Sequence, residues 1–99
     1  MPEREVMGRG KVMVVDDEKT IRDTLSELLS DEGYQVCAVA NGFEAIEEIA
    51  KDDYDVVICD IRMPGMDGTQ VLEKVSEISP HSFLIMITTA FVSLWVWLM

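Results

Sequence analysis

The chain has 99 residues, 48% of them hydrophobic, and a formal net charge of −11. This length is enough for one small domain, and the hydrophobic content can fill a core, which excludes disorder for most of the chain. The acidic charge argues against nucleic-acid backbones and anionic membrane surfaces as direct partners. Cys37 and Cys59 lie in predicted strands without metal-binding spacing, and the charged start of the chain lacks the apolar stretch of a signal peptide. We therefore expect a cytoplasmic protein with reduced thiols.

The first half of the chain predicts two strands, each followed by a helix. After a lead-in over residues 1–10, which we expect to be mobile, the apolar run Lys11–Val15 forms the first strand. A helix follows and ends at Gly33; its apolar face carries Ile21, Leu25, Leu28 and Leu29. The second predicted strand is Tyr34–Val39. Capping-box spacing from Asn41 to Glu44 then opens a helix with the apolar residues Phe43, Ile46, Ile49 and Ala50.

The second half repeats the pattern. The third strand, Tyr54–Cys59, leads directly to Asp60. Asp67 to Gln70 has capping-box spacing and opens a third helix, which Pro80 ends; its apolar residues are Val71, Leu72, Val75 and Ile78. Phe83–Thr88 is the fourth apolar strand. Strands separated by single helices predict an α/β fold, with a parallel sheet that is covered on both faces. In such sheets, functional sites form at the carboxyl ends of the strands.

Acidic residues stand at two of these carboxyl ends: Asp16 and Asp17 after the first strand, and Asp60 after the third. If the two strands are neighbours, carboxylates about 4 Å apart repel by roughly 4 kcal/mol at an effective dielectric near 20. A divalent cation would relieve this repulsion. Mg²⁺ suits such ligands, with Asp17 and Asp60 binding directly, Asp16 directly or through water, and the Arg62 carbonyl adding an oxygen. Asp60 is then a plausible nucleophile that forms an aspartyl-phosphate, and the Thr89 hydroxyl could contact a phosphoryl oxygen.

Each of these residues also has a purely structural interpretation. Asp16 and Asp17 could cap the following helix, because acids are common at that position. Asp60 alone would usually be a turn residue, and Thr89 alone an ordinary hydroxyl at the end of a strand. Their combination in sheet order favours a site.

The chain resembles the receiver domain of two-component response regulators. The matching motifs are Val14-Val15-Asp16-Asp17-Glu18, Asp60-Ile61-Arg62-Met63-Pro64-Gly65-Met66-Asp67-Gly68, and Thr89-Ala90 after an apolar strand. The sequence around Asp60 is most similar to that of receivers attached to sigma-54-dependent activators. The resemblance implies a flavodoxin-like fold and transfer of a phosphoryl group to Asp60 from a sensor histidine kinase or a histidine phosphotransfer protein. It also implies that Asp16, Asp17 and the Arg62 carbonyl hold Mg²⁺ and that Thr89 is the switch residue. The domain would then be a phosphoacceptor that phosphorylates itself rather than a turnover enzyme.

The resemblance stops at about Ala90, so we expect a partial receiver over residues 11–90 with four of five strands and three helices. The family would continue with a helix, a fifth strand that ends in an essential lysine, and a final helix. No lysine follows Lys74 in this chain. We therefore expect slower phosphorylation, an impaired output surface, a partly uncovered sheet face and an open edge at the fourth strand, which self-association would complete.

The apolar tail over residues 91–99 admits three interpretations. With the fourth strand, Phe83–Met99 is a run of 17 uncharged residues, the lower limit of a membrane span, although the strand already accounts for its first part. The tail could instead pair with another copy or cover the exposed face, or it could be a non-native end. We do not expect a membrane anchor, and we expect a homo-oligomer formed through the exposed edge or the tail.

The main alternative function is a non-catalytic interaction module that docks a kinase or other receivers. It would keep the kinase-docking surface of the first helix, and phosphoryl turnover at Asp60 separates it from a phosphoacceptor. Mononucleotide binding is set aside because Asp16 and Asp17 occupy the position of a phosphate loop and would repel a phosphate. We expect no direct DNA binding, because the sequence has neither a helix-turn-helix segment nor a basic stripe.

Overall fold

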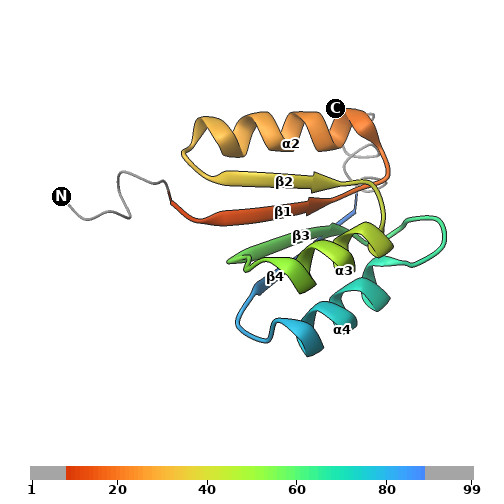
Figure 1. The fold of residues 1–99 in the computed structure, drawn as a ribbon. Coiled ribbons are helices and arrows are strands. Elements are labelled where there is room, and N and C mark those ends of the chain that lie inside the picture. The colour runs from red at the N-terminus through yellow and green to blue at the C-terminus, as the bar shows by residue number, and fades with distance from the viewer. Residues whose placement is uncertain (1–8, 89–99) are drawn as a thin grey trace.

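The computed structural model describes residues 9–88, and the rest of the chain lies outside that part. Within it, four strands and three helices alternate (Figure 1): β1 (Lys11–Val15), α2 (Lys19–Asp31), β2 (Gln35–Val39), α3 (Gly42–Lys51), β3 (Val56–Asp60), α4 (Gly68–Ile78) and β4 (Phe83–Ile87). The strands are parallel and lie in the order β2-β1-β3-β4. The predicted parallel α/β architecture is confirmed. The first strand has the predicted ends, and the ends of the other three lie within two residues of the predicted ones. Most of the predicted lead-in and the whole of the predicted tail lie outside the described residues.

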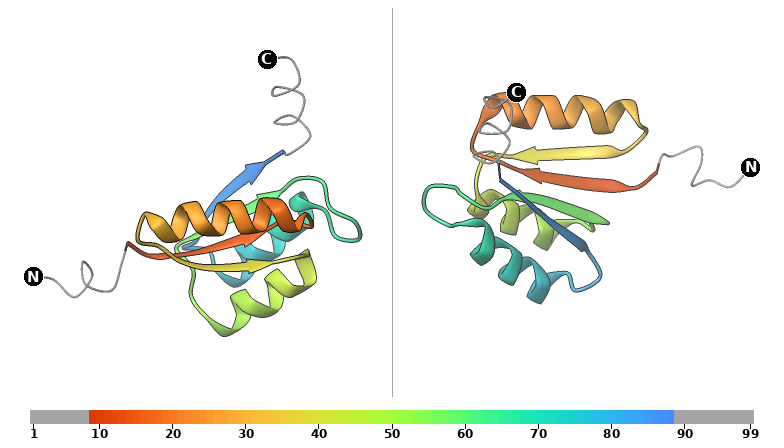
Figure 2. Two further views of the ribbon diagram at one scale, coloured as in Figure 1. Left: turned by 90° about the horizontal axis from the view of Figure 1, so that it is seen from above. Right: turned by 180° about the vertical axis from the view of Figure 1, so that it is seen from behind.

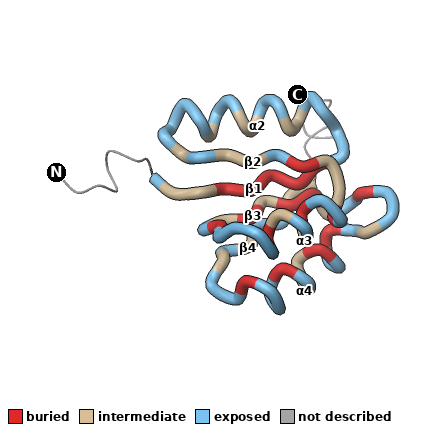
Figure 3. The backbone as a smooth tube through the Cα atoms, in the orientation of Figure 1, coloured by how far each residue is buried: buried red, intermediate tan, exposed pale blue. Residues whose placement is uncertain are grey.

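Helices cover both faces of the sheet. α2 lies on one face, over β1 and β2, while α3 and α4 lie on the other (Figures 1 and 2). The main hydrophobic core fills the space between the sheet and α3 and α4. It contains Met13, Val15, Val39, Ala45, Ile49, Tyr54, Val57, Cys59, Met63, Val71 and Val75. Figure 3 shows that burial is concentrated along β1 and β3, the two central strands.

Strand register aligns the carboxyl ends of the central strands. Val15 of β1 is opposite Cys59 of β3, and Asp60 at the end of β3 is opposite Ile87 of β4. The residue that follows Val15 is Asp16. The sheet therefore brings Asp16 and Asp60 to the same edge.

Side-chain caps start two of the helices where the sequence predicts them. The Asn41 carboxamide oxygen accepts the Glu44 N–H at 2.9 Å, and the Glu44 carboxylate accepts the Ala40 N–H at 2.8 Å. At α4 the capping box is complete, because Asp67 accepts the Gln70 N–H at 3.0 Å while Gln70 accepts the Asp67 N–H at 3.1 Å. Each helix start is thus set by a short stretch of sequence.

The predicted apolar faces are partly wrong. Leu28 and Phe43 were expected to face the core, but they are 58% and 63% exposed. The buried face of α3 carries Gly42, Ala45 and Ile49, and Phe43 lies outside this face. α2 has no buried residue at all, because a single helix packed over two strands leaves its flanks in solvent.

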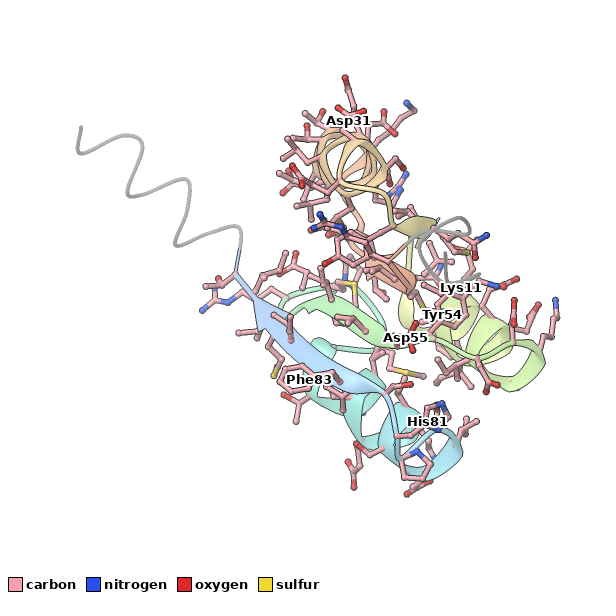
Figure 4. All side chains as sticks on the ribbon, turned by 90° about the vertical axis from the view of Figure 1, so that its left-hand side faces the viewer. Lys11, Asp31, Tyr54, Asp55, His81 and Phe83 are labelled. Carbon is pink, nitrogen blue, oxygen red and sulfur yellow. The ribbon has the colours of Figure 1, made fainter. Side chains whose placement is uncertain are left out.

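The amino ends of the strands are held by polar contacts (Figure 4). Lys11 pairs with the Asp52 carboxylate, and its ammonium nitrogen lies 5.1 Å from the centre of the Tyr54 ring. The Asp55 carboxylate accepts the backbone N–H of Lys11 at 2.9 Å. Gly10, at φ 138°, allows this approach, because a Cβ there would lie 2.8 Å from the same carboxylate. These contacts stabilise the fold at the edge opposite the acidic residues.

No helix in residues 9–88 combines the length and the apolar character that crossing a bilayer requires.

Candidate functional site

Three carboxylates meet at the carboxyl edge of the sheet. Asp16, Asp17 and Asp60 each offer an oxygen, and these oxygens lie within 4.8 Å of one another. Asp16 and Asp60 are 0% and 1% exposed, whereas Asp17 faces solvent. The juxtaposition arises because β1 and β3 are adjacent and parallel, so that the turns leaving both strands lie side by side.

Each buried carboxylate uses one oxygen to brace its own turn. Asp16 Oδ1 accepts the Glu18 N–H at 2.9 Å, and Asp60 Oδ1 accepts the Arg62 N–H at 3.2 Å. Asp60 is thus a turn residue as well as a member of the cluster. The capping interpretation of Asp16 and Asp17 is wrong, because the N-cap of α2 is Glu18 and its side chain makes no cap bond. The bonds within the turns orient both carboxyl groups in advance.

The cluster is electrostatically unfavourable by itself. Burial raises the pKa of Asp16, and the nearby charges of Asp60 and Asp17 raise it further, against the opposing bond from the Glu18 amide. Asp16 Oδ2 is buried and has no hydrogen-bond partner in the described residues. A buried acidic oxygen beside two further carboxylates fits the oxygen-rich ligand set that Mg²⁺ takes.

Cys59 precedes Asp60 at the end of β3 but is not a candidate nucleophile. Burial and the negative charges of Asp60, Asp16 and Asp67 raise the pKa of its thiol to about 12. The thiol therefore remains protonated at neutral pH, and a thiol rather than a thiolate is a poor nucleophile.

Sequence reasoning missed two residues that shape the site. Arg22, in the first turns of α2, donates from Nη1 to the backbone carbonyl of Asp16 at 2.7 Å. Gly68, the first residue of α4, packs so closely that a Cβ there would lie 2.4 Å from the carbonyl oxygen of Asp60. The sequence carries no local signal for the contact of Arg22. Gly68 itself is a weak signal for its contact with the Asp60 carbonyl, because the start of a helix does not need the left-handed backbone that usually explains a glycine.

The turn after Asp60 forms the wall of a surface pocket of about 500 Å³. It is lined by Ile61, Arg62, Met63, Pro64, Asp67 and Thr69. The Arg62 N–H donates to the Asp60 carboxylate within this turn. The loop that follows Asp60 therefore contacts both the acidic site and the pocket.

The structure describes the first of the two threonines after β4. Thr88 is half-buried and lies one residue past Ile87, the partner of Asp60 in the sheet. Thr89, the preferred candidate for phosphoryl contact, lies outside the described residues. Lys74 is exposed on α4, 3.7 Å from the Glu77 carboxylate.

Comparison with known proteins gives consistent matches. The family model described as "Response regulator receiver domain" matches residues 12–93. The chain is 37% identical over 78 residues to the sporulation initiation phosphotransferase F of Bacillus subtilis, covering 79% of this chain and 63% of that protein. It is 40% identical over 82 residues to the DNA-binding transcriptional regulator NtrC of Escherichia coli K12, covering 83% of this chain and 18% of that protein. The chain thus spans less than two thirds of each of these relatives.

Solved structures agree. The response regulator TrrA of Thermotoga maritima, in complex with Mg(2+)-BeF, matches with a TM-score of 0.76 and 38% identity over 80% of this chain and 69% of that one. TrrA in complex with the histidine kinase ThkA matches with a TM-score of 0.75 and 38% identity over 80% of this chain and 68% of that one. With its matching fold and sequence, this chain belongs to the response regulator receiver domains, which have a flavodoxin-like fold and act in two-component signalling.

Proposed function

We propose that this domain accepts a phosphoryl group on Asp60 from the phosphohistidine of a sensor histidine kinase or a histidine phosphotransfer protein. The observation that carries the proposal is the buried Asp60 within 4.8 Å of Asp16 and Asp17. A carboxylate oxygen of Asp60 attacks phosphorus, and an acyl phosphate forms as the P–N bond breaks. The electron pair of that bond stays on the imidazole nitrogen of the donor. The complex of the related TrrA with the histidine kinase ThkA supports this class of partner.

Asp16, Asp17 and Asp60, with the backbone carbonyl of Arg62, would hold Mg²⁺. The buried Asp16 Oδ2 supports this assignment, as does the Mg(2+)-BeF complex of the related TrrA. The cation would neutralise negative charge on the phosphoryl oxygens. The chain's own contribution is orientation: the bonds from the Glu18 and Arg62 amides hold both buried carboxylates in place before the donor arrives.

Thr89 is proposed as the phosphoryl contact and switch residue, from its place in the sequence two residues past Ile87. A positively charged group that is aimed at the transferring phosphoryl group would normally add to the rate. Among the described residues, Lys74 is not a candidate for this group, because it is exposed on α4, 3.7 Å from the Glu77 carboxylate. We also propose the cytoplasm as its location, which suits the two free cysteines, Cys37 and Cys59.

One observation favours the alternative, a non-catalytic module that docks a kinase or other receivers. α2 buries none of its residues, and Leu28 is 58% exposed, so this helix offers an apolar surface to a partner whether or not Asp60 reacts. Self-association through the β4 edge or residues 91–99 stays a prediction.

Intact mass after incubation with Mg²⁺ and a small acyl phosphate donor tests the proposal. We expect a single phosphoryl adduct in the parent and in Asp53→Asn, which changes an exposed aspartate outside the cluster, and no adduct in Asp60→Asn. An adduct that persists in Asp60→Asn would show that the phosphoacceptor is another residue. No adduct in folded parent protein would leave the docking module as the function.

A further inference from the structure

Three of the four polar atoms of Asp16 are bonded to the protein. Its backbone N–H donates to the Val39 carbonyl of β2 at 3.2 Å, and its carboxylate Oδ1 accepts the Glu18 N–H at 2.9 Å. Its backbone carbonyl accepts a hydrogen bond from Nη1 of Arg22 at 2.7 Å. The fourth atom, Oδ2, is buried and has no partner within residues 9–88. Bonds to three different residues therefore fix the direction in which Oδ2 points.

The bond from Arg22 joins α2 to the turn that carries Asp16 and Asp17. α2 begins beside the carboxyl end of β1 (Figure 1), but none of its 13 residues, all of them described, is buried, and its N-cap Glu18 makes no side-chain cap bond. Full burial and a side-chain cap, which fix the starts of many helices, are thus both missing from α2. Arg22 is half-buried one helical turn after Glu18. Because a guanidinium group is a strong and rigid donor, its bond holds the turn against the helix.

We propose that Arg22 is a positioning residue for the Mg²⁺ site, because its bond to the Asp16 carbonyl holds the turn in which Asp16 and Asp17 serve as ligands. This role rests on the proposed magnesium site at Asp16, Asp17 and Asp60. Arg22 bonds to the backbone carbonyl, so Asp16 Oδ2 stays available to the cation. Residues that orient metal ligands without touching the metal contribute to its affinity.

The charge of Arg22 alone predicts the opposite effect from this role. Arg22 is a cation near a cation site, so removal of its charge would strengthen Mg²⁺ binding through reduced Coulomb repulsion. Loss of positioning would weaken binding, because Asp16 and Asp17 would no longer be held in the geometry that a small, octahedral cation demands. The sign of the change in affinity therefore separates positioning from charge.

Titration with Mg²⁺ at pH 7, without a phosphodonor, measures this affinity through the amide NMR signals of the turn. In Arg22→Met, which keeps a long side chain but removes the donor, we expect the dissociation constant to rise roughly 10- to 100-fold. Arg22→Lys keeps a donor and should recover most of the parent's affinity. Lys19→Met is the matched control, because Lys19 is an exposed cation of the same helix that pairs with Asp23. This control should bind Mg²⁺ as tightly as the parent or slightly more tightly.

Urea unfolding in the presence of a chelator separates positioning from a purely structural role. A purely structural Arg22 would make folded Arg22→Met less stable but leave its Mg²⁺ dissociation constant unchanged, and that result would overturn the proposal. Tighter binding by Arg22→Met, or binding by Arg22→Lys as weak as that of Arg22→Met, would also overturn it. If the parent binds no Mg²⁺, both the magnesium site and the role of Arg22 are refuted. Equal binding by the parent and Arg22→Met refutes the role of Arg22 alone.

A measurement on the parent decides the matter even if Arg22→Met does not fold. The bond to the Asp16 carbonyl should hinder rotation of the Arg22 guanidinium group, so that its two Nη atoms give separate NMR signals. We expect these separate signals in the metal-free protein and at saturating Mg²⁺, while the exposed Arg9 gives an averaged signal in both. An averaged signal from Arg22 in both states would refute the proposal.

Discussion

Replacing Asp60 by asparagine should stabilise the metal-free protein. The oxygens of the three clustered carboxylates lie within 4.8 Å of one another. Two unit charges at that separation repel by about 3.5 kcal/mol at an effective dielectric near 20. Solvent screening at the exposed Asp17 relieves part of this repulsion. We therefore expect the free energy of unfolding to rise by roughly 1–2 kcal/mol. The carboxamide oxygen introduced by the substitution can still accept the Arg62 N–H.

Urea unfolding followed by far-UV circular dichroism measures this change, at pH 7 in low salt with a chelator present. Glu73→Gln is the matched control, because it removes one negative charge from an exposed position on α4. Salt should shrink the advantage of Asp60→Asn over this control. Mg²⁺ at 100 times its dissociation constant should stabilise the parent by about 2.7 kcal/mol and the Asp60→Asn variant by less. Equal stability of the two variants in chelator would refute the claim that like charges at this edge destabilise the fold.

Three further predictions concern the same region. Gly68→Ala should lower the free energy of unfolding by about 1–3 kcal/mol, because its Cβ would meet the Asp60 carbonyl; an unchanged urea midpoint would contradict that close approach. Asp67→Ala should cost about 1 kcal/mol through loss of the α4 capping box, whereas loss of helix content beyond α4 would point to a wider role. The raised pKa of Asp16 means that the folded protein binds more protons than the unfolded chain between the ordinary value of 3.8 and the raised one. Relative to Asp16→Asn, the metal-free parent should therefore gain stability as the pH falls through this range. Over the same range its affinity for Mg²⁺ should decrease. If the stabilities of the two proteins depend on pH in parallel, Asp16 is not the titrating group.

The starts of α3 and α4 and the succession of strands along the chain were predictable because their signals are local. Asn41 and Asp67 each bond to an amide three residues ahead, so a few consecutive residues determine where α3 and α4 begin. The apolar faces were less predictable. Phe43 fits the helical spacing, yet α3 buries Ala45 and Ile49, because the burial of a position depends on the angle at which the helix meets the sheet.

The sequence by itself determined the chemical content of the site: acidic residues placed directly after two apolar strands, and turns that begin with those acids. Only the tertiary structure decided that β1 and β3 are neighbours, which brings Asp16 and Asp60 together and buries both. It also decided that Arg22 holds the Asp16 carbonyl and that Gly68 packs on the Asp60 carbonyl. Such contacts join elements distant in the chain, and their geometry follows from how the sheet and helices pack rather than from any stretch of consecutive residues.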